Sequence, residues 1–181
     1  MYYSTVYLSP IGKITIACDG PGQNLAGLWI EGQKYHGDTI PEAMVGRDDM
    51  PIFDTAKKWL DRYFAGEKPV ISELPLAPIG SGFRQEVWQI LCKIPYGKVI
   101  TYGGIAEKMA VKLKKENMSS RAAGGAVAHN PISIIIPCHR VVGSDGSLTG
   151  YSGGVQMKVK LLELEGADMS RFFVPAKGTA L

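Results

Sequence analysis

The chain has 181 residues and a mass of 19.6 kDa, and 45% of its residues are hydrophobic, which excludes disorder for most of its length. No apolar run approaches the roughly 20 residues needed to cross a bilayer, so we expect no membrane partner. Residues 1–80 carry 7 Lys and Arg against 10 Asp and Glu (−3), whereas residues 81–181 carry 13 against 7 (+6). The second half is the expected polyanion-binding half, although enzymes that bind no nucleic acid carry similar excesses.

Strand patterns dominate the first residues of the chain. Residues 2–8, 13–18 and 24–30 are rich in Val, Ile, Tyr, Thr and Leu and are separated by turn residues, which predicts an antiparallel meander. Apolar residues at helical spacing from Ile52 to Phe64 predict an amphipathic helix that packs on this sheet. The first half is therefore expected to form a small α/β domain.

Prolines and glycines between Glu67 and Gly82 interrupt any regular pattern, and the local charge changes sign there. We place a domain boundary in this stretch. The expected organisation is an N-terminal domain over 1–78, a C-terminal domain over 79–168 and a flexible tail over 169–181.

Helical patterns follow the boundary. Phe83 to Ile94 predicts a helix, and Thr101 can cap a second helix. The segment 119–129 predicts a third helix of small residues, from which Arg121 protrudes. The last two helices form a helix-turn-helix pattern, in which a slim second helix suits a narrow groove of DNA. Because each helical glycine costs roughly 1 kcal/mol relative to alanine, the glycine pair in this helix indicates either close packing or a functional contact.

The rest of the chain adds a wing and a last helix. Residues Gly143 to Ser147 predict a hairpin-like wing, and Val155 to Leu162 predict a closing helix that ends before Gly166.

Pro137-Cys138-His139-Arg140 places a thiol beside an imidazole, directly after the apolar run Ile132 to Ile136, which we interpret as extended. Free cysteines are mostly small buried hydrophobic residues, so the pair alone favours function only weakly. Turn residues bracket it on both sides and predict rigid flanks. A reactive cysteine is the first hypothesis. The other cysteines, Cys18 and Cys92, are distant in sequence and form no Cys-x-x-Cys pair, which indicates a reducing cytoplasm and no disulfide framework.

The block from Gly124 to Gly143 resembles the active site of the O6-alkylguanine-DNA alkyltransferases, the methylated-DNA–protein-cysteine methyltransferases. The resemblance covers roughly residues 80–166 and includes the segments Phe83–Trp88, Ile94–Gly97, Gly150–Gly154 and Leu162–Gly166. It implies an α+β fold, with a ribonuclease H-like N-terminal domain followed by a winged helix-turn-helix domain.

The resemblance also implies a function. The protein would flip O6-alkylguanine, or as a second candidate O4-alkylthymine, out of duplex DNA by binding the minor groove, and would transfer the alkyl group irreversibly to Cys138. A relay of Glu165, His139 and water would generate the thiolate, Asn130 would order the turn, and Tyr102 would assist the departing guanine. No cofactor or metal is implied, and we expect a monomer. Contacts to the base or to DNA are expected from Arg121, Ala122, Ala123, Val141, Tyr151, Ser152 and Lys158.

Two departures from the family pattern stand out. The connection from Val111 to Met118 is longer and contains lysines that would add phosphate contacts or only solubility. Residues 1–80 offer only Cys18 and His36 as the cysteine and histidine ligands of a zinc ion, so no structural zinc is expected.

Other functions remain open at this point. One is a non-catalytic protein that binds alkylated DNA, and another is a cysteine hydrolase that uses the same thiol and imidazole. A third is an added regulatory role through a second alkylated cysteine, for which Cys18 lacks an activating context.

Overall fold

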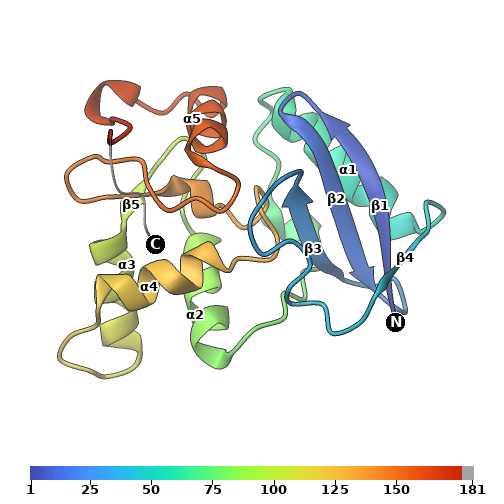
Figure 1. The fold of residues 1–181 in the computed structure, drawn as a ribbon, viewed down its shortest axis with the longest axis horizontal. Helices are drawn as coiled ribbons and strands as arrows, with labels where there is room; N and C mark the ends of the chain where they lie inside the picture. The colour runs from blue at the N-terminus through green and yellow to red at the C-terminus, as the bar shows by residue number, and fades with distance from the viewer. Residues whose placement is uncertain (177–181) are drawn as a thin grey trace. The chain divides into compact units, whose positions relative to one another are not determined.

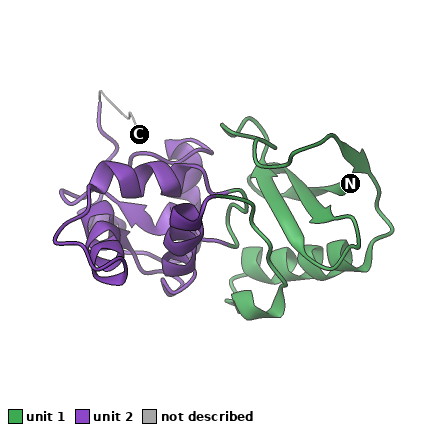
Figure 2. Ribbon diagram, turned by 90° about the horizontal axis from the view of Figure 1, so that it is seen from below, with its two compact units in different colours: residues 1–80, 131–135 green, residues 81–130, 136–181 purple. Residues whose placement is uncertain are grey.

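The computed structural model describes residues 1–176 and divides into two compact units (Figure 2). Unit 1 contains Met1–Gly80 together with Pro131–Ile135, and unit 2 contains Ser81–Asn130 and the chain from Ile136 onward. Unit 1 thus takes in a short segment from the second half of the sequence. None of the helices in residues 1–176 is long and apolar enough to span a bilayer.

A four-stranded sheet forms one layer of unit 1, with the strand order β3-β2-β1-β4 (Figure 1). The first three strands pair antiparallel, with Thr5 opposite Ile16 and Ile16 opposite Leu28. The fourth strand pairs parallel to β1 and was not expected, because its three residues carry no alternating pattern. The strands are β1 (Tyr2–Ser9), β2 (Gly12–Asp19), β3 (Leu25–Ile30) and β4 (Met44–Gly46).

Helix α1 (Pro51–Phe64) covers one face of this sheet (Figure 1). Pro51 occupies the first helical turn, where its missing N–H costs nothing. The apolar face predicted from the sequence is buried, and Phe53 and Leu60 have no exposed surface. Burial of each such side chain contributes about 1.5–3 kcal/mol, so this face holds the helix on the sheet. A short 3-10 helix, η1 (Ile71–Glu73), follows.

Residues Pro131–Ile135 differ from the extended run that the sequence suggested. The carbonyl of Pro131 accepts a hydrogen bond from Leu28 N at 2.8 Å, and Ser133 N donates to Leu28 O at 2.9 Å. The segment then turns, and Ile134 adopts a φ of 71°, which is rare for a β-branched residue. A short apolar run does not by itself distinguish a strand from a buried turn, and here the edge of β3 decides the conformation.

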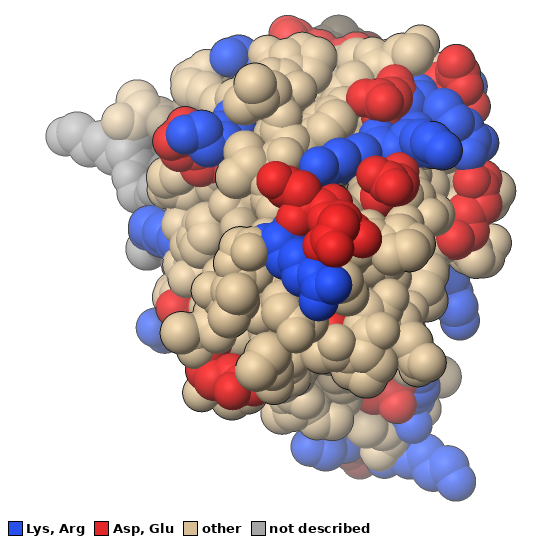
Figure 3. Space-filling model, turned by 90° about the vertical axis from the view of Figure 1, so that its right-hand side faces the viewer, with Lys and Arg blue, Asp and Glu red and all other residues tan. Residues whose placement is uncertain are grey.

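Charges of both signs lie side by side on the face drawn in Figure 3. Ion pairs in unit 1 include Arg62 with Glu73 at 2.5 Å and Arg47 with Asp49 at 2.6 Å. Interspersed charges of this kind suit a solvated surface better than a polyanion-binding patch.

Three helices form the main layer of unit 2, and each begins with a capping hydroxyl. The side chains of Ser81, Thr101 and Ser119 accept hydrogen bonds from the first-turn amides of their helices. The indole of Trp88 donates to Ala126 O at 2.9 Å and ties the first of these helices to the last. The helices are α2 (Gly82–Leu91), α3 (Tyr102–Lys112) and α4 (Ser120–Ala128).

The remaining elements complete unit 2. Gly143 N donates to Ser147 O at 2.9 Å and closes the turn predicted as a wing. Residues 169–181 were expected to form a tail, but Phe173 N donates to Gly146 O at 3.1 Å and anchors the start of this segment, whereas residues 177–181 lie outside the described chain. These elements are β5 (Ile100–Thr101), η2 (Cys138–Arg140), β6 (Val141–Val142), α5 (Val155–Leu164) and η3 (Met169–Arg171).

Candidate active site

Cys138 begins the 3-10 helix η2 and is only 2% exposed. Its sulfur accepts a hydrogen bond from Asn130 Nδ2 at 3.1 Å. The same amide nitrogen donates to Ile136 O at 2.8 Å, so Asn130 fixes the backbone before the thiol as well as the thiol itself. The resemblance implied that Asn130 orders the turn and so supports the thiol, but it did not specify a hydrogen bond to the sulfur.

The protonated thiol is the resting form of Cys138. Burial raises its pKa to about 11, although the hydrogen bond from Asn130 and the charge of Lys158 partly oppose this rise. A thiolate is the reactive nucleophile, so this cysteine needs a base that removes its proton during the reaction.

His139 and Glu165, which form a buried pair beside the thiol, are the candidates for such a base. His139 Nε2 lies 2.6 Å from Glu165 Oε1, and neither side chain is accessible to solvent. Arg140 donates to both carboxylate oxygens, from Nε to Oε2 at 2.8 Å and from Nη2 to Oε1 at 2.9 Å. Burial alone would raise the pKa of Glu165, but the hydrogen bonds from His139 and Arg140, together with the charge of Arg140, outweigh it and hold the pKa well below its usual value. Glu165 is therefore ionised, and its carboxylate acts only as a hydrogen-bond acceptor.

This carboxylate determines the tautomer of His139. Burial lowers the pKa of His139 despite the opposing effect of Glu165, which favours the neutral imidazole. Because Nε2 must donate to the carboxylate, Nδ1 carries the free lone pair. Nδ1 is buried and makes no hydrogen bond within residues 1–176. The imidazole can therefore accept a proton at Nδ1.

The Ile94-Pro95-Tyr96-Gly97 turn holds the acidic end of this network. Gly97 N donates to Glu165 Oε2 at 3.2 Å, and Arg140 Nη1 donates to Ile94 O at 2.6 Å. Gly97 has a φ of 73°, and a Cβ at this position would lie 2.7 Å from Glu165 O. Glycine is therefore required there both by the backbone conformation and by the close approach.

Lys158 is fully buried on α5, where its Nζ donates to Val141 O and, at 2.8 Å, to Thr149 O. Burial lowers its pKa to about 8, and the negative charge of a Cys138 thiolate would raise it. Tyr102 donates to the same Thr149 carbonyl at 2.9 Å, and Lys158 Nζ lies 5.7 Å from the centre of its ring. Burial, followed by the charge of Cys138, raises the pKa of Tyr102, so its phenol stays protonated.

The other predicted contact residues divide into two groups. Val141, Tyr151 and Ser152 are buried, and the ring of Tyr151 lies edge-on to His139 with centroids 6.4 Å apart. On α4, Arg121 and Ala122 are exposed whereas Ala123 is buried. A Cβ added at Gly125 would meet nothing within 4 Å, so packing does not explain this glycine.

Models of two protein domains match the chain. The 6-O-methylguanine DNA methyltransferase ribonuclease-like domain matches residues 1–78, and the 6-O-methylguanine DNA methyltransferase DNA-binding domain matches residues 82–167. The chain belongs to the O6-methylguanine DNA methyltransferase family. Its fold is accordingly α+β, with a ribonuclease-like sheet domain followed by a helical DNA-binding domain, as the resemblance implied.

Individual methyltransferases agree with this assignment. The methylated-DNA–protein-cysteine methyltransferase of Haemophilus influenzae is 40% identical over 90% of this chain and 86% of its own length. That of Methanosarcina acetivorans is 41% identical over 92% of this chain and 99% of its own. The crystal structure of Mycobacterium tuberculosis O6-methylguanine methyltransferase has a TM-score of 0.75 at 38% identity and covers 98% of this chain and 97% of that one. A structure of the M. tuberculosis protein in complex with DNA matches equally well, with a TM-score of 0.75 over 97% of this chain and 95% of that one.

Sequence reasoning did not single out every residue that builds the site in this methyltransferase. Arg140, Ile94 and Gly97 were quoted only within motifs, yet they hold Glu165 in place. A charged Arg140 within the apolar stretch that surrounds Cys138 was an available signal, because a buried guanidinium needs a carboxylate partner. Lys112, grouped with the lysines of the long connection, is instead the last residue of α3 and is paired with Glu86.

Proposed function

We propose that Cys138 is the residue that accepts the alkyl group when this protein repairs O6-alkylguanine in DNA. The activity is that of a methylated-DNA–protein-cysteine methyltransferase. The observation that supports this assignment is a buried chain of hydrogen bonds from Arg140 to Glu165 and from Glu165 to His139. Within residues 1–176 the other imidazole nitrogen of His139, Nδ1, has no hydrogen-bond partner, and His139 directly follows Cys138.

The reaction needs one proton transfer away from the sulfur. A water molecule between His139 Nδ1 and Cys138 Sγ would pass the thiol proton to the imidazole, and Glu165 would stabilise the imidazolium that forms. The amide of Asn130 and the ammonium of Lys158 would favour the thiolate as it develops.

The thiolate then attacks the alkyl carbon. A carbon–sulfur bond forms while the bond between that carbon and guanine O6 breaks, and its electron pair goes to the guanine. The guanine that leaves is an anion and becomes neutral when it takes up one proton. We propose that the protonated phenol of Tyr102 donates this proton. Because a thioether has no easy route back to a thiol, each protein molecule would act once.

The protein binds DNA through its helical domain, and α4 is the element that we propose for the minor groove. Its small outward residues, Ala122 and Gly125, permit a close approach. Arg121 in the first turn would fill the space that the flipped base leaves in the stack. Within the site, Val141, Tyr151 and Ser152 would contact the extruded base, and Ala123 would support the helix from beneath.

We also propose that the protein acts as a monomer in the cytoplasm. Cys18, Cys92 and Cys138 are all free thiols, which suits a reducing compartment.

Intact-protein mass spectrometry tests the function directly. Incubation with a duplex that contains one O6-methylguanine should add one methyl group per protein, and peptide mapping should place it on Cys138. An unchanged mass combined with tight binding of the lesion would instead assign the protein to the non-catalytic binders, and turnover of an ester would favour the hydrolase.

Arg121→Ala should slow the repair of duplex DNA about tenfold or more, because the base has to be held out of the stack at a cost of a few kcal/mol. Transfer from free O6-benzylguanine should change little, since no stack has to be opened. Single-turnover rates on both substrates check this prediction, with the exposed Lys160→Ala as the matched loss of one charge. Equal slowing on both substrates would place Arg121 in the chemical step instead.

A further inference from the structure

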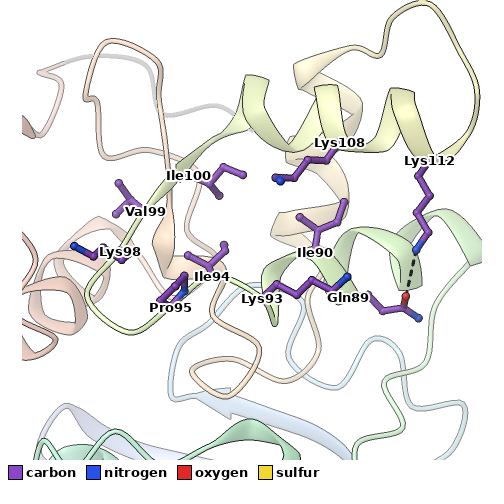
Figure 4. Close-up of a pocket in the computed structure, with 10 residues that line it drawn as sticks. All are labelled: Gln89, Ile90, Lys93, Ile94, Pro95, Lys98, Val99, Ile100, Lys108 and Lys112. Carbon is purple, nitrogen blue, oxygen red and sulfur yellow. Dashed lines mark hydrogen bonds between the residues drawn. The ribbon is translucent and has the colours of Figure 1, made fainter.

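A cavity of about 510 Å³ in unit 2 has no part of Cys138, His139 or Glu165 in its lining, although Ile94 and Pro95 belong both to the cavity and to the turn that holds Glu165. It lies between the end of α2, the turn that follows, β5 and α3 (Figure 4). Its apolar lining comes from Ile90, Ile94, Pro95, Val99 and Ile100. The volume is within the range of small ligand-binding sites, about 300–1,000 Å³.

Four lysines contribute to the lining, two from the turn that follows α2 and two from α3. Lys112 Nζ donates a hydrogen bond to Gln89 Oε1 at 3.3 Å and forms an ion pair with Glu86. Lys93, Lys98 and Lys108 are exposed, and within residues 1–176 none of them forms an ion pair with a carboxylate. Figure 4 shows Lys108 extending from α3 toward Ile100, while Lys93 lies along the wall formed by the end of α2. The cavity therefore combines an apolar floor with a rim of unneutralised positive charge.

The apolar lining and the unpaired lysines together determine which kind of ligand fits the cavity. A DNA backbone would neutralise the lysines but would offer no apolar group to the isoleucines beneath them. A single small carboxylate would not meet both Lys108, which extends from α3, and Lys93, which lies on the opposite side of the apolar lining (Figure 4). A peptide that carries several carboxylates along its chain, with an apolar side chain between them, satisfies both features.

We propose that this cavity binds an acidic peptide segment of a partner protein. An apolar side chain of the segment lies on Ile90, Ile94 and Ile100, and its carboxylates face Lys93 and Lys108, whereas Lys98 points away from these isoleucines (Figure 4). The rim pairs are solvent-exposed and individually weak, so the apolar contact supplies most of the affinity and the lysines supply selectivity for acidic partners. This role goes beyond alkyl transfer and does not depend on Cys138.

The test is fluorescence anisotropy of the full chain with a short labelled peptide in which aspartates alternate with leucines, without DNA present. The double variant Lys93→Glu/Lys108→Glu should weaken binding about tenfold or more, because attraction at two rim positions becomes repulsion. The exposed Lys160→Glu, which lies on α5 outside the cavity lining, is the charge-matched control and should bind like the unmodified protein. A peptide with serine in place of leucine should bind at least tenfold more weakly.

Several results would overturn the proposal. Equal loss of affinity in Lys160→Glu and in the double variant would mean a general charge effect. Equal binding of the serine peptide would show that the apolar lining does not contribute to affinity. If undamaged duplex DNA competes with the peptide for the unmodified protein but not for the double variant, the cavity binds DNA instead. Single-turnover alkyl transfer by the double variant should match that of the unmodified protein, so failure of this proposal and failure of the proposed function remain distinguishable.

Discussion

Cys138→Ala should abolish alkyl transfer while leaving binding to DNA that contains O6-methylguanine within about threefold. The thiol is buried, whereas Arg121 and Ala122 of α4, which we propose for the duplex, are exposed, and the substitution removes only a sulfur at a site that is 2% exposed. The neighbouring His139 and Glu165 keep their hydrogen bond, but no nucleophile remains for the base they form. Intact mass after incubation with the lesion duplex measures transfer, and an electrophoretic mobility shift measures binding.

Cys92→Ala provides the matched control for this experiment. Cys92 is a second free thiol in unit 2, it is partly buried, and burial raises its pKa as it does that of Cys138. It differs in lacking a paired imidazole on the next residue, so its removal should leave transfer unchanged. A methyl group found on the Cys138→Ala protein, or loss of transfer in Cys92→Ala, would contradict the assignment of Cys138. Loss of DNA binding in Cys138→Ala would show that the residue has a structural role as well.

Local signals in the sequence were enough to predict most helices. The hydroxyls of Thr101 and Ser119 cap α3 and α4 as expected, because a capping interaction spans only two or three residues. The strands of the first half followed from short β-branched runs between turns. In contrast, the conformation of Ile134 depends on the hydrogen bonds that β3 offers to its neighbours, and these pair residues about 100 positions apart in the chain. No local pattern contains that information.

The candidate site was predictable to a different degree at each residue. Cys138 and His139 stand together in the sequence, whereas Glu165 lies 26 residues from His139 and was connected to it only through the family resemblance. Without that resemblance, a glutamate before a glycine at a helix end is usually a solvated residue. Arg140 could have been recognised as buried, but its partner could not, since several carboxylates in the second half were equally available in sequence.

Glu165→Gln should slow alkyl transfer about a hundredfold or more and destabilise the fold by about 3–5 kcal/mol. The amide cannot stabilise an imidazolium at His139 as a carboxylate does, and general-base catalysis of this kind contributes about 10²–10⁴ in rate. The substitution also leaves the buried guanidinium of Arg140 without a counter-charge, which accounts for the loss of stability. Glu163→Gln, on the exposed side of α5, is the matched control and should change neither quantity.

The pH dependence of unfolding separates the charge of Glu165 from its shape. Because its pKa in the folded protein lies far below the value of about 4.3 in the unfolded chain, the carboxylate stabilises the fold above that pH and loses its contribution as the pH falls further. Denaturant titrations should therefore show the full difference between the unmodified protein and Glu165→Gln near pH 7, and the two free energies of unfolding should draw together progressively as the pH falls below about 4. A difference that stays constant down to acidic pH would mean that the glutamine disturbs packing rather than removing a charge. A transfer rate within twofold of the unmodified protein, measured where the variant is folded, would remove Glu165 from the relay and leave His139 to act without it.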